Sequence, residues 1–430
     1  MESNARSDAR AREGPGSRNF RGVGASTKDS AKPYLFVLVV AAASAGFAEH
    51  VTGGQALIWG QSAGTLIPVF GTLIAVGLWM PLQRWNERDA LREAFLVSLL
   101  ILWVVHGVLT RFHGDAVMYS VWMAPVAILL LAWKPPNQGE LLSALRVLGW
   151  VLLITLASTR SLEVLGVLDV FALPAGNVAF DIENYWLPFS GQFGLEGRWP
   201  GPLRHPNEVG VVAAFLVVLA GIVKSKSGWA FGVAGFLFLL LAGTRVGYVA
   251  AASGVAVLLA FGSAPLIRNI QLRVRLAGAL ALVGMVALIM LSQSMNLTGR
   301  TNSIWPAFLD LWERSPWFGV GSSGMKAAGG ITEQYMHGHN IVIDELARNG
   351  LVGLAALVSV MGVAAIICVR ALLKAKPDSA AIVITFLVVG VSHTPLNWLT
   401  FSPVGVVLVL GVLLATQQVP GRPIRTGRGS

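Results

Sequence analysis

The sequence predicts an all-α fold, a polytopic membrane helical bundle of about twelve transmembrane helices. Two observations predict it. Hydrophobic residues make up 54% of the 430 residues and charged residues only 13%, whereas a soluble domain has roughly 25% charged residues. Apolar runs also recur from Tyr34 almost to the C-terminus, which is more apolar sequence than a soluble core can bury.

The chain divides into three predicted regions. Residues 1–32 are rich in Gly, Ser, Arg and Ala and almost free of apolar residues, so we expect a disordered basic cytoplasmic tail. Residues 33–418 form the polytopic membrane domain, and residues 419–430 form a second cytoplasmic tail. The even spacing of the apolar segments indicates one bundle, although several segments are short and must tilt or thin the bilayer. The expected spans lie near residues 34–48, 63–80, 94–110, 116–133, 147–160, 207–223, 229–243, 246–263, 276–292, 350–369, 380–393 and 403–416.

The distribution of basic residues predicts the orientation of this bundle in the membrane. If the N-terminus is cytoplasmic, 23 of the 32 Lys and Arg residues fall in cytoplasmic segments, as the positive-inside rule expects. Both termini are then cytoplasmic, and the formal charge of +10 reflects these loops rather than a nucleic-acid-binding surface. The two largest loops, about 161–206 and 293–349, are predicted to be extracytoplasmic.

Several arginines lie on the predicted outer face, against the topological bias. Arg245 lies in GTRVG (243–247), a tight turn between two apolar spans; the others are Arg198, Arg204 and Arg300. They can snorkel to lipid headgroups or pair with carboxylates. Alternatively they form a guanidinium cluster for a diphosphate, because the arginine fork matches phosphate oxygens and keeps its charge. Asp181 and Glu183 form a D-x-E motif whose two carboxylates could hold a metal ion, and the sequence does not decide whether they do.

The stretch MHGHNIVIDELARN (336–349) is unusually polar. Asn340 is a favourable N-cap for a helix of about ten residues that ends at Gly350. His339 then lies at the positive end of that helix, which attracts phosphate and disfavours the imidazolium ion. A neutral imidazole there can act as a general base toward a hydroxyl group. His337 is a weaker candidate, for orienting the substrate.

Four motifs also carry a family resemblance. GRWPGPLRHPN, GTRVG, TGRTNSIWPAFLDLWERSPWFGVGSSG and HNIVIDELARNGLVG follow in order within about residues 195–370, and they resemble the O-antigen ligase and polymerase superfamily. The resemblance implies a C-type-like glycosyltransferase core of the bacterial cytoplasmic membrane, active on the extracytoplasmic face with no cofactor and no essential metal. It implies His339 as the base and Arg245 and Arg300 as ligands of the donor diphosphate. Arg198 is a looser match.

Residues and resemblance together predict a transfer reaction. The donor is a polyprenyl-diphosphate-linked glycan, and the acceptor is a hydroxyl of a glycan, lipid or protein. The arginines stabilise the departing diphosphate while His339 takes the hydroxyl proton. A secondary transporter or polysaccharide exporter stays open as an alternative, since twelve spans with both termini inside also suit a transporter. Ligase and polymerase share these motifs, so the sugar and the acceptor are left open, as are the oligomeric state and the participation of His337.

Overall fold

The computed structural model describes residues 57–58, 61–62, 90–114, 138–166, 199, 201–203, 206–223, 225–262, 304–330, 332, 338, 340–374, 376–392 and 403–416. Within these residues the fold is helical except for one small antiparallel hairpin of β1 (Leu57–Ile58) and β2 (Gln61–Ser62). The all-α prediction is confirmed. The predicted spans near 34–48, 63–80, 116–133 and 276–292 lie outside the described residues, so twelve spans stay a prediction, as do the two tails.

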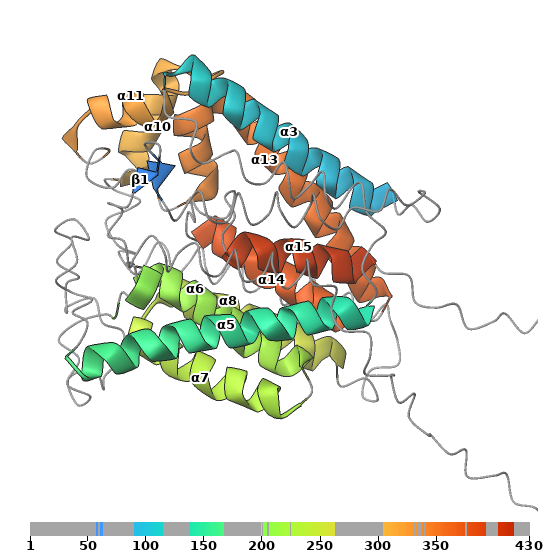
Figure 1. Cartoon of the computed structure of the whole chain (residues 1–430). Coiled ribbons are helices and arrows are strands. Elements are labelled where there is room, and N and C mark those ends of the chain that lie inside the picture. The colour runs from blue at the N-terminus through green and yellow to red at the C-terminus, as the bar shows by residue number, and fades with distance from the viewer. Residues whose placement is uncertain are drawn as a thin grey trace, which may run out of the picture.

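Eight of the described helices overlap predicted spans in order, and the three shortest lie within the two predicted loops (Figure 1). They are α3 (Ala90–Phe112), α5 (Gln138–Val164), η4 (Gly201–Leu203), α6 (Pro206–Ile222), α7 (Lys226–Ala242), α8 (Arg245–Gly262), α10 (Trp305–Arg314), α11 (Gly321–Ala327), α13 (Ile341–Leu373), α14 (Pro377–Ser392) and α15 (Pro403–Thr416). By length and composition, α3, α5, α8 and α13 can each cross a membrane, and α6, α7, α14 and α15 are shorter apolar helices.

Helix α6 is the central element. It is apolar around its whole circumference, and nearly all of its side chains are buried, which is typical of a helix surrounded by other helices. It packs against α5, α7, α8 and α14. The peripheral helices keep large apolar side chains exposed, among them Val108 on α3, Ile154 on α5 and Trp229 on α7, as expected of surfaces that face lipid.

Small residues bring these helices into close contact. A Cβ atom on Gly235 of α7 would lie 2.9 Å from the Ala213 carbonyl oxygen of α6. On the other side, the Thr385 hydroxyl of α14 donates to the Ala250 carbonyl of α8 at 3.4 Å. Interfaces between membrane helices commonly use such small residues and side-chain hydrogen bonds, because lipid supplies no hydrophobic drive for association.

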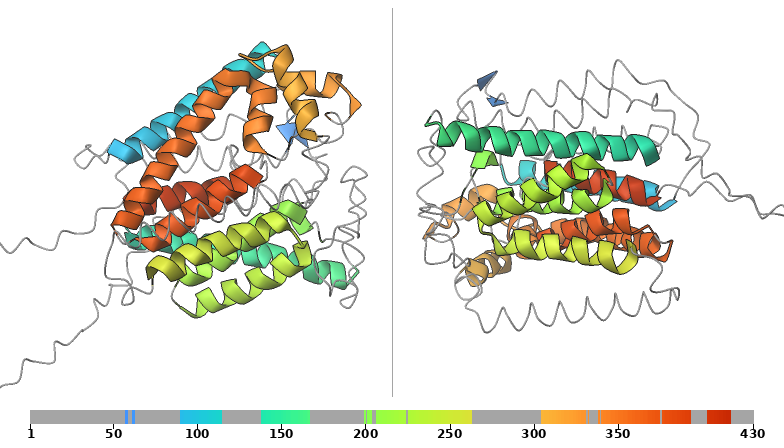
Figure 2. Two further views of the ribbon diagram at one scale, coloured as in Figure 1. Left: turned by 180° about the vertical axis from the view of Figure 1, so that it is seen from behind. Right: turned by 90° about the horizontal axis from the view of Figure 1, so that it is seen from below.

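Helix α14 shows which helix ends lie together. Its first residue, Pro377, lies beside Gly262 at the C-terminus of α8, whereas Gly390 near its own C-terminus lies beside Ile341 at the start of α13. The N-termini of α8 and α13 therefore share one end of the bundle, which we call the site end. Helices α10 and α11 gather where α3 ends and α13 begins (Figures 1 and 2).

Candidate functional site

The turn that carries Arg245 has only two residues between α7 and α8. Gly243 adopts the left-handed conformation (φ 56°, ψ 36°), and its N–H donates to the Leu239 carbonyl at 2.9 Å, which ends α7. Thr244 then caps α8, because its hydroxyl accepts from the Gly247 N–H at 3.1 Å. Arg245 is the first residue of α8. The predicted tight turn is confirmed.

Helix α6 holds this turn in place. A Cβ atom on Gly210 would overlap the Thr244 hydroxyl, and a Cβ on Gly247 would lie 2.8 Å from the Gly210 carbonyl oxygen. Thr244 itself is fully buried. The two glycines of GTRVG therefore have different roles: Gly243 permits the left-handed turn, and Gly247 permits contact with α6. The backbone of Arg245 is fixed by both.

Within the described part of the chain, the guanidinium of Arg245 has unused hydrogen-bonding capacity. Its Nη1 atom is buried and has no hydrogen-bond partner among the described residues. A buried charged donor without an acceptor is costly, so such a group calls for a partner such as water, an ion or a ligand. The N-terminus of α8 adds a positive partial charge at the same place. Among the described residues no carboxylate pairs with Arg245, so an anionic group at this place is compatible with the structure.

Trp199 is anchored near this turn. Its backbone N–H donates to the Leu241 carbonyl at 3.0 Å, and its ring stacks on Phe238 with centroids 5.6 Å apart. The indole Nε1–H donates to Glu163 Oε2 at 2.8 Å, and Arg160 forms an ion pair with the same oxygen at 2.6 Å. The ends of α5 and α7 therefore hold Trp199 at the site end.

The second part of the candidate site is the start of α13. The Asn340 side chain accepts hydrogen bonds from the N–H groups of Val342 at 2.9 Å and Ile343 at 3.4 Å, so the predicted N-cap is confirmed. Gly338, which lies between the two histidines in the sequence, is held on both sides. Its N–H donates to Asp344 Oδ1 at 3.1 Å, and its carbonyl accepts from Trp305 Nε1 at 2.9 Å.

Helix α13 is broken at Gly350, where φ is 63° and ψ is −161°. The predicted end of the short helix is therefore confirmed, and we call residues 341–349 the half-helix. The helix resumes at once after Gly350, which the sequence analysis placed within a separate span near 350–369. Glycine adopts a positive φ without steric strain, which explains why a glycine occupies the position of the break.

The loop 315–320 fills the break. The Leu351 N–H donates to the Pro316 carbonyl at 2.8 Å, and the Val352 N–H donates to the Trp317 carbonyl at 3.1 Å. Backbone groups freed by the break are thus satisfied, as membrane helices require. The motifs ERSPWFGVG and DELARNGLVG, which are separate in the sequence, form one packed unit.

A buried polar cluster joins the half-helix to α3. His106 Nε2 lies 2.7 Å from Glu345 Oε1, and Asn349 Nδ2 donates to the same oxygen at 2.9 Å. A Cβ atom on Gly353 would overlap both Asn349 Cβ and Glu345 Oε1. The second glycine of the motif therefore makes room for the carboxylate.

Two of the residues predicted from the sequence are described, Arg245 and Asn340, and both lie at the site end. The other predicted residues lie outside the described residues; they are Arg198, Arg204, Arg300, His337, His339, Asp181 and Glu183. Their neighbours in the chain are placed, however: Trp199 follows Arg198, and Gly338 separates the two histidines.

The sequence analysis missed several residues that shape this region, namely His106, Glu163, Trp199, Trp305, Asp344 and Glu345. The sequence held a signal for Asp344 and Glu345, because two adjacent carboxylates at the start of a long apolar stretch are unusual. No local signal marked His106 or Trp305, because their partners lie 239 and 33 residues away.

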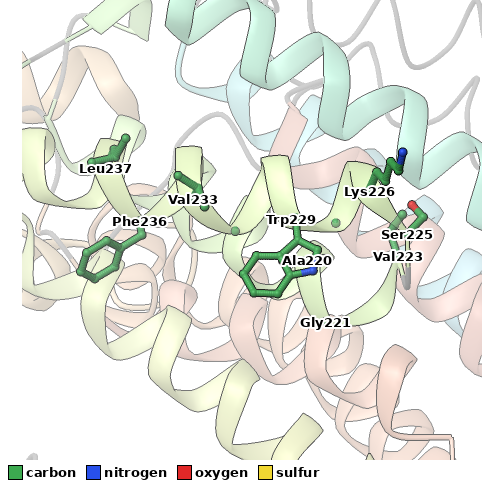
Figure 3. A pocket seen from close by; sticks show the side chains of 11 residues that line it. Ala220, Gly221, Val223, Ser225, Lys226, Trp229, Val233, Phe236 and Leu237 are labelled. Carbon is green, nitrogen blue, oxygen red and sulfur yellow. The ribbon is translucent and has the colours of Figure 1, made fainter.

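A groove of about 870 Å³ lies elsewhere, on the outer side of α6 and α7 (Figure 3). Its lining is mostly apolar and includes the exposed Trp229, with Lys226 at one edge. It begins at the α6–α7 connection, which is the opposite end of these helices from Arg245. A tryptophan and a lysine at a helix end are typical of the membrane interface.

Comparison with known proteins agrees with the motifs. The family described as O-antigen ligase matches residues 209–358, a range that includes Arg245, Arg300, the HGHN segment and the break at Gly350. Curated proteins give no significant match to the chain. The match of residues 209–358 therefore supports the O-antigen ligase superfamily for this chain, in agreement with the four motifs.

Proposed function

We propose that this membrane protein transfers a glycan from a polyprenyl-diphosphate donor to an acceptor hydroxyl at the site end, in the manner of an O-antigen ligase or a polysaccharide polymerase. The observation that carries the proposal is the buried Nη1 of Arg245, which has no described hydrogen-bond partner. It lies at the first residue of α8, at the same end of the bundle as the Asn340-capped start of α13.

The proposed chemistry is a displacement at the anomeric carbon of the donor sugar. The acceptor oxygen forms the new glycosidic bond, and the bond from the anomeric carbon to the diphosphate oxygen breaks. The electron pair of that bond leaves with polyprenyl diphosphate, and the hydroxyl proton passes to His339. Arg245 stabilises the charge that grows on the leaving group, and Arg300, Arg198 and Arg204 complete the cationic site.

The held peptide at Gly338 supports His339 as the base. Asp344 and Trp305 fix Gly338, and Asn340 caps the helix on the other side of His339. A base must lie within hydrogen-bond reach of the hydroxyl that it deprotonates. The described neighbours of His339 on both sides are thus fixed, which is the support that the structure offers for this role.

The proposed location is the bacterial cytoplasmic membrane, with the site end on the extracytoplasmic face. The positive-inside bias supports this side. In that position the lipid tail of the donor stays in the bilayer while its glycan extends into water. Arginines supply permanent positive charge for the diphosphate, so the proposal involves no cofactor and assigns no role to a metal.

A transfer assay with purified lipid-linked donor and acceptor tests this function. We expect the R245A and H339A variants to release polyprenyl diphosphate at least about a hundredfold more slowly than the unmodified protein. R314A is the matched control, because Arg314 is an exposed arginine of α10, and we expect it to retain full activity. Unchanged release by both R245A and H339A, with normal membrane levels, would refute the proposal and would leave transport of the glycan as the alternative.

A further inference from the structure

The polar cluster between α3 and α13 has no role in the reaction proposed above. We propose that His106 is a positioning residue for that reaction: it binds the Glu345 carboxylate and thereby orients the half-helix that begins at the HGHN segment. The inference rests on the proposed function, because the half-helix matters for turnover only if its N-terminal segment acts on substrate.

The contacts within the cluster are short and buried. His106 Nε2 lies 2.7 Å from Glu345 Oε1, and the exposed fractions of the two side chains are 14% and 6%. The Asn349 amide donates to the same carboxylate oxygen and also lies 3.3 Å from His106 Nε2. A carboxylate that accepts two hydrogen bonds is held in direction as well as in distance.

Such a cluster is costly in a membrane protein. Ionisable groups within membrane-spanning helices are expensive to bury, and they usually serve a function of the bundle interior. Apolar side chains could join α3 to α13 without this cost, as they do elsewhere along the two helices. The space left by Gly353 shows that the surrounding helix accommodates the carboxylate specifically.

The break at Gly350 explains why the half-helix needs such a contact. A continuous helix would inherit its direction from residues 351–373, but the left-handed φ of Gly350 interrupts that continuity. The direction of the half-helix must therefore come from its lateral contacts. Its C-terminal end is held by loop 315–320, where the Val320 N–H donates to the Ala347 carbonyl at 2.9 Å.

Helix α3 contacts both parts of this assembly. His106 binds the half-helix, and His113, the first residue after α3, donates through Nε2 to the Phe318 carbonyl at 2.9 Å. The Ser323 hydroxyl in turn donates to the His113 carbonyl at 3.2 Å. A single membrane helix thus holds the half-helix and the loop that fills its break, and His106 is its direct link to the half-helix side chains.

The test compares two replacements of similar size, H106Q and H106M. Glutamine retains an N–H donor near the position of Nε2, whereas methionine fills the space without one. With lipid-linked donor in saturating amount, we expect H106M to lower kcat by about ten- to a hundredfold, the effect of losing a hydrogen bond to a charged group. We expect H106Q to stay within about threefold of the unmodified protein.

Affinity for polyprenyl diphosphate separates positioning from general damage. We expect H106M to bind it as the unmodified protein does, because Arg245 lies on a different helix. S98A is the control on α3, since the Ser98 hydroxyl bonds only within its own helix among the described residues. The inference is overturned if H106M and H106Q have equal kcat, or if H106M loses kcat, diphosphate affinity and thermal stability together.

The same assay distinguishes this inference from the proposed function. If R245A and H339A retain turnover, the proposed function itself is wrong. If these two variants are inactive while H106M turns over at the normal rate, the function stands and the positioning role of His106 is refuted.

Discussion

The Asp344 carboxylate accepts a hydrogen bond from the Gly338 backbone N–H at 3.1 Å, which ties the first turn of α13 back to the segment before its cap. Asp344 is buried, with 3% of its surface exposed. A negative charge in the first turn of a helix is favourable in itself. The same carboxylate thus stabilises the helix and fixes the peptide between the two histidines.

Loss of this carboxylate is expected to impair turnover. D344A leaves the Gly338 N–H without its acceptor, at a cost of about 1–3 kcal/mol, so we expect turnover to fall by about ten- to a hundredfold. D344N keeps an oxygen acceptor and should be affected much less. Steady-state transfer rates check this. D310A is the control, because Asp310 is an exposed residue of α10. Equal rates for D344A and the unmodified protein would mean that Gly338 needs no anchor.

The cap of α8 is expected to affect donor binding. T244V removes the hydroxyl that accepts from Gly247, which costs about 1 kcal/mol of stability, and shifts the start of α8 where Arg245 lies. T244S keeps the hydroxyl. We therefore expect T244V, but not T244S, to bind polyprenyl diphosphate several-fold more weakly in a titration. The opposite order of the two variants would show that the methyl group, not the cap, positions Arg245.

The break in α13 gives a stability prediction with an internal control. G350A places a Cβ at a left-handed φ and against the Trp317 carbonyl and the Phe318 amide, so we expect a loss of about 2 kcal/mol or more. Gly362 lies in the same helix, and a Cβ atom there would meet no other group within 4 Å, so G362A should not destabilise the protein. Thermal unfolding in detergent measures both. Similar melting temperatures for the two variants would contradict the structural role of the break.

The sidedness of the bundle is tested by cysteine labelling. In a C368A background, A328C lies at the site end after α11, and S225C lies in the connection between α6 and α7. The positive-inside bias predicts that a membrane-impermeant reagent labels A328C in intact cells and labels S225C only after permeabilisation. The reverse pattern would place the site end in the cytoplasm.

Local features of the fold were predictable from the sequence. The cap at Asn340, the end of the half-helix at Gly350 and the turn at Arg245 follow from residue types with strong conformational preferences. Span lengths were less predictable. The expected span near 147–160 is part of α5, which begins at Gln138, because a hydropathy pattern excludes the polar first turns that still form helix.

Long-range partners in the candidate site were not predictable. The indole of Trp199 reaches Glu163, and the imidazole of His106 reaches Glu345. Neither contact leaves a periodic or motif-like trace, since each depends on how separate helices pack. The assignment of charged residues to a diphosphate therefore stays a prediction from the sequence, while contacts such as Trp199–Glu163 and His106–Glu345 became visible only in the folded bundle.

Binding of polyprenyl diphosphate to purified R245A tests the central claim most directly. If Arg245 grips the diphosphate of the donor, R245A should bind it about ten- to a hundredfold more weakly than the unmodified protein, and R314A should bind it normally. Binding of the corresponding polyprenyl alcohol, which lacks the diphosphate, should be the same in all three proteins. Equal affinity of R245A and the unmodified protein for the diphosphate would contradict the account.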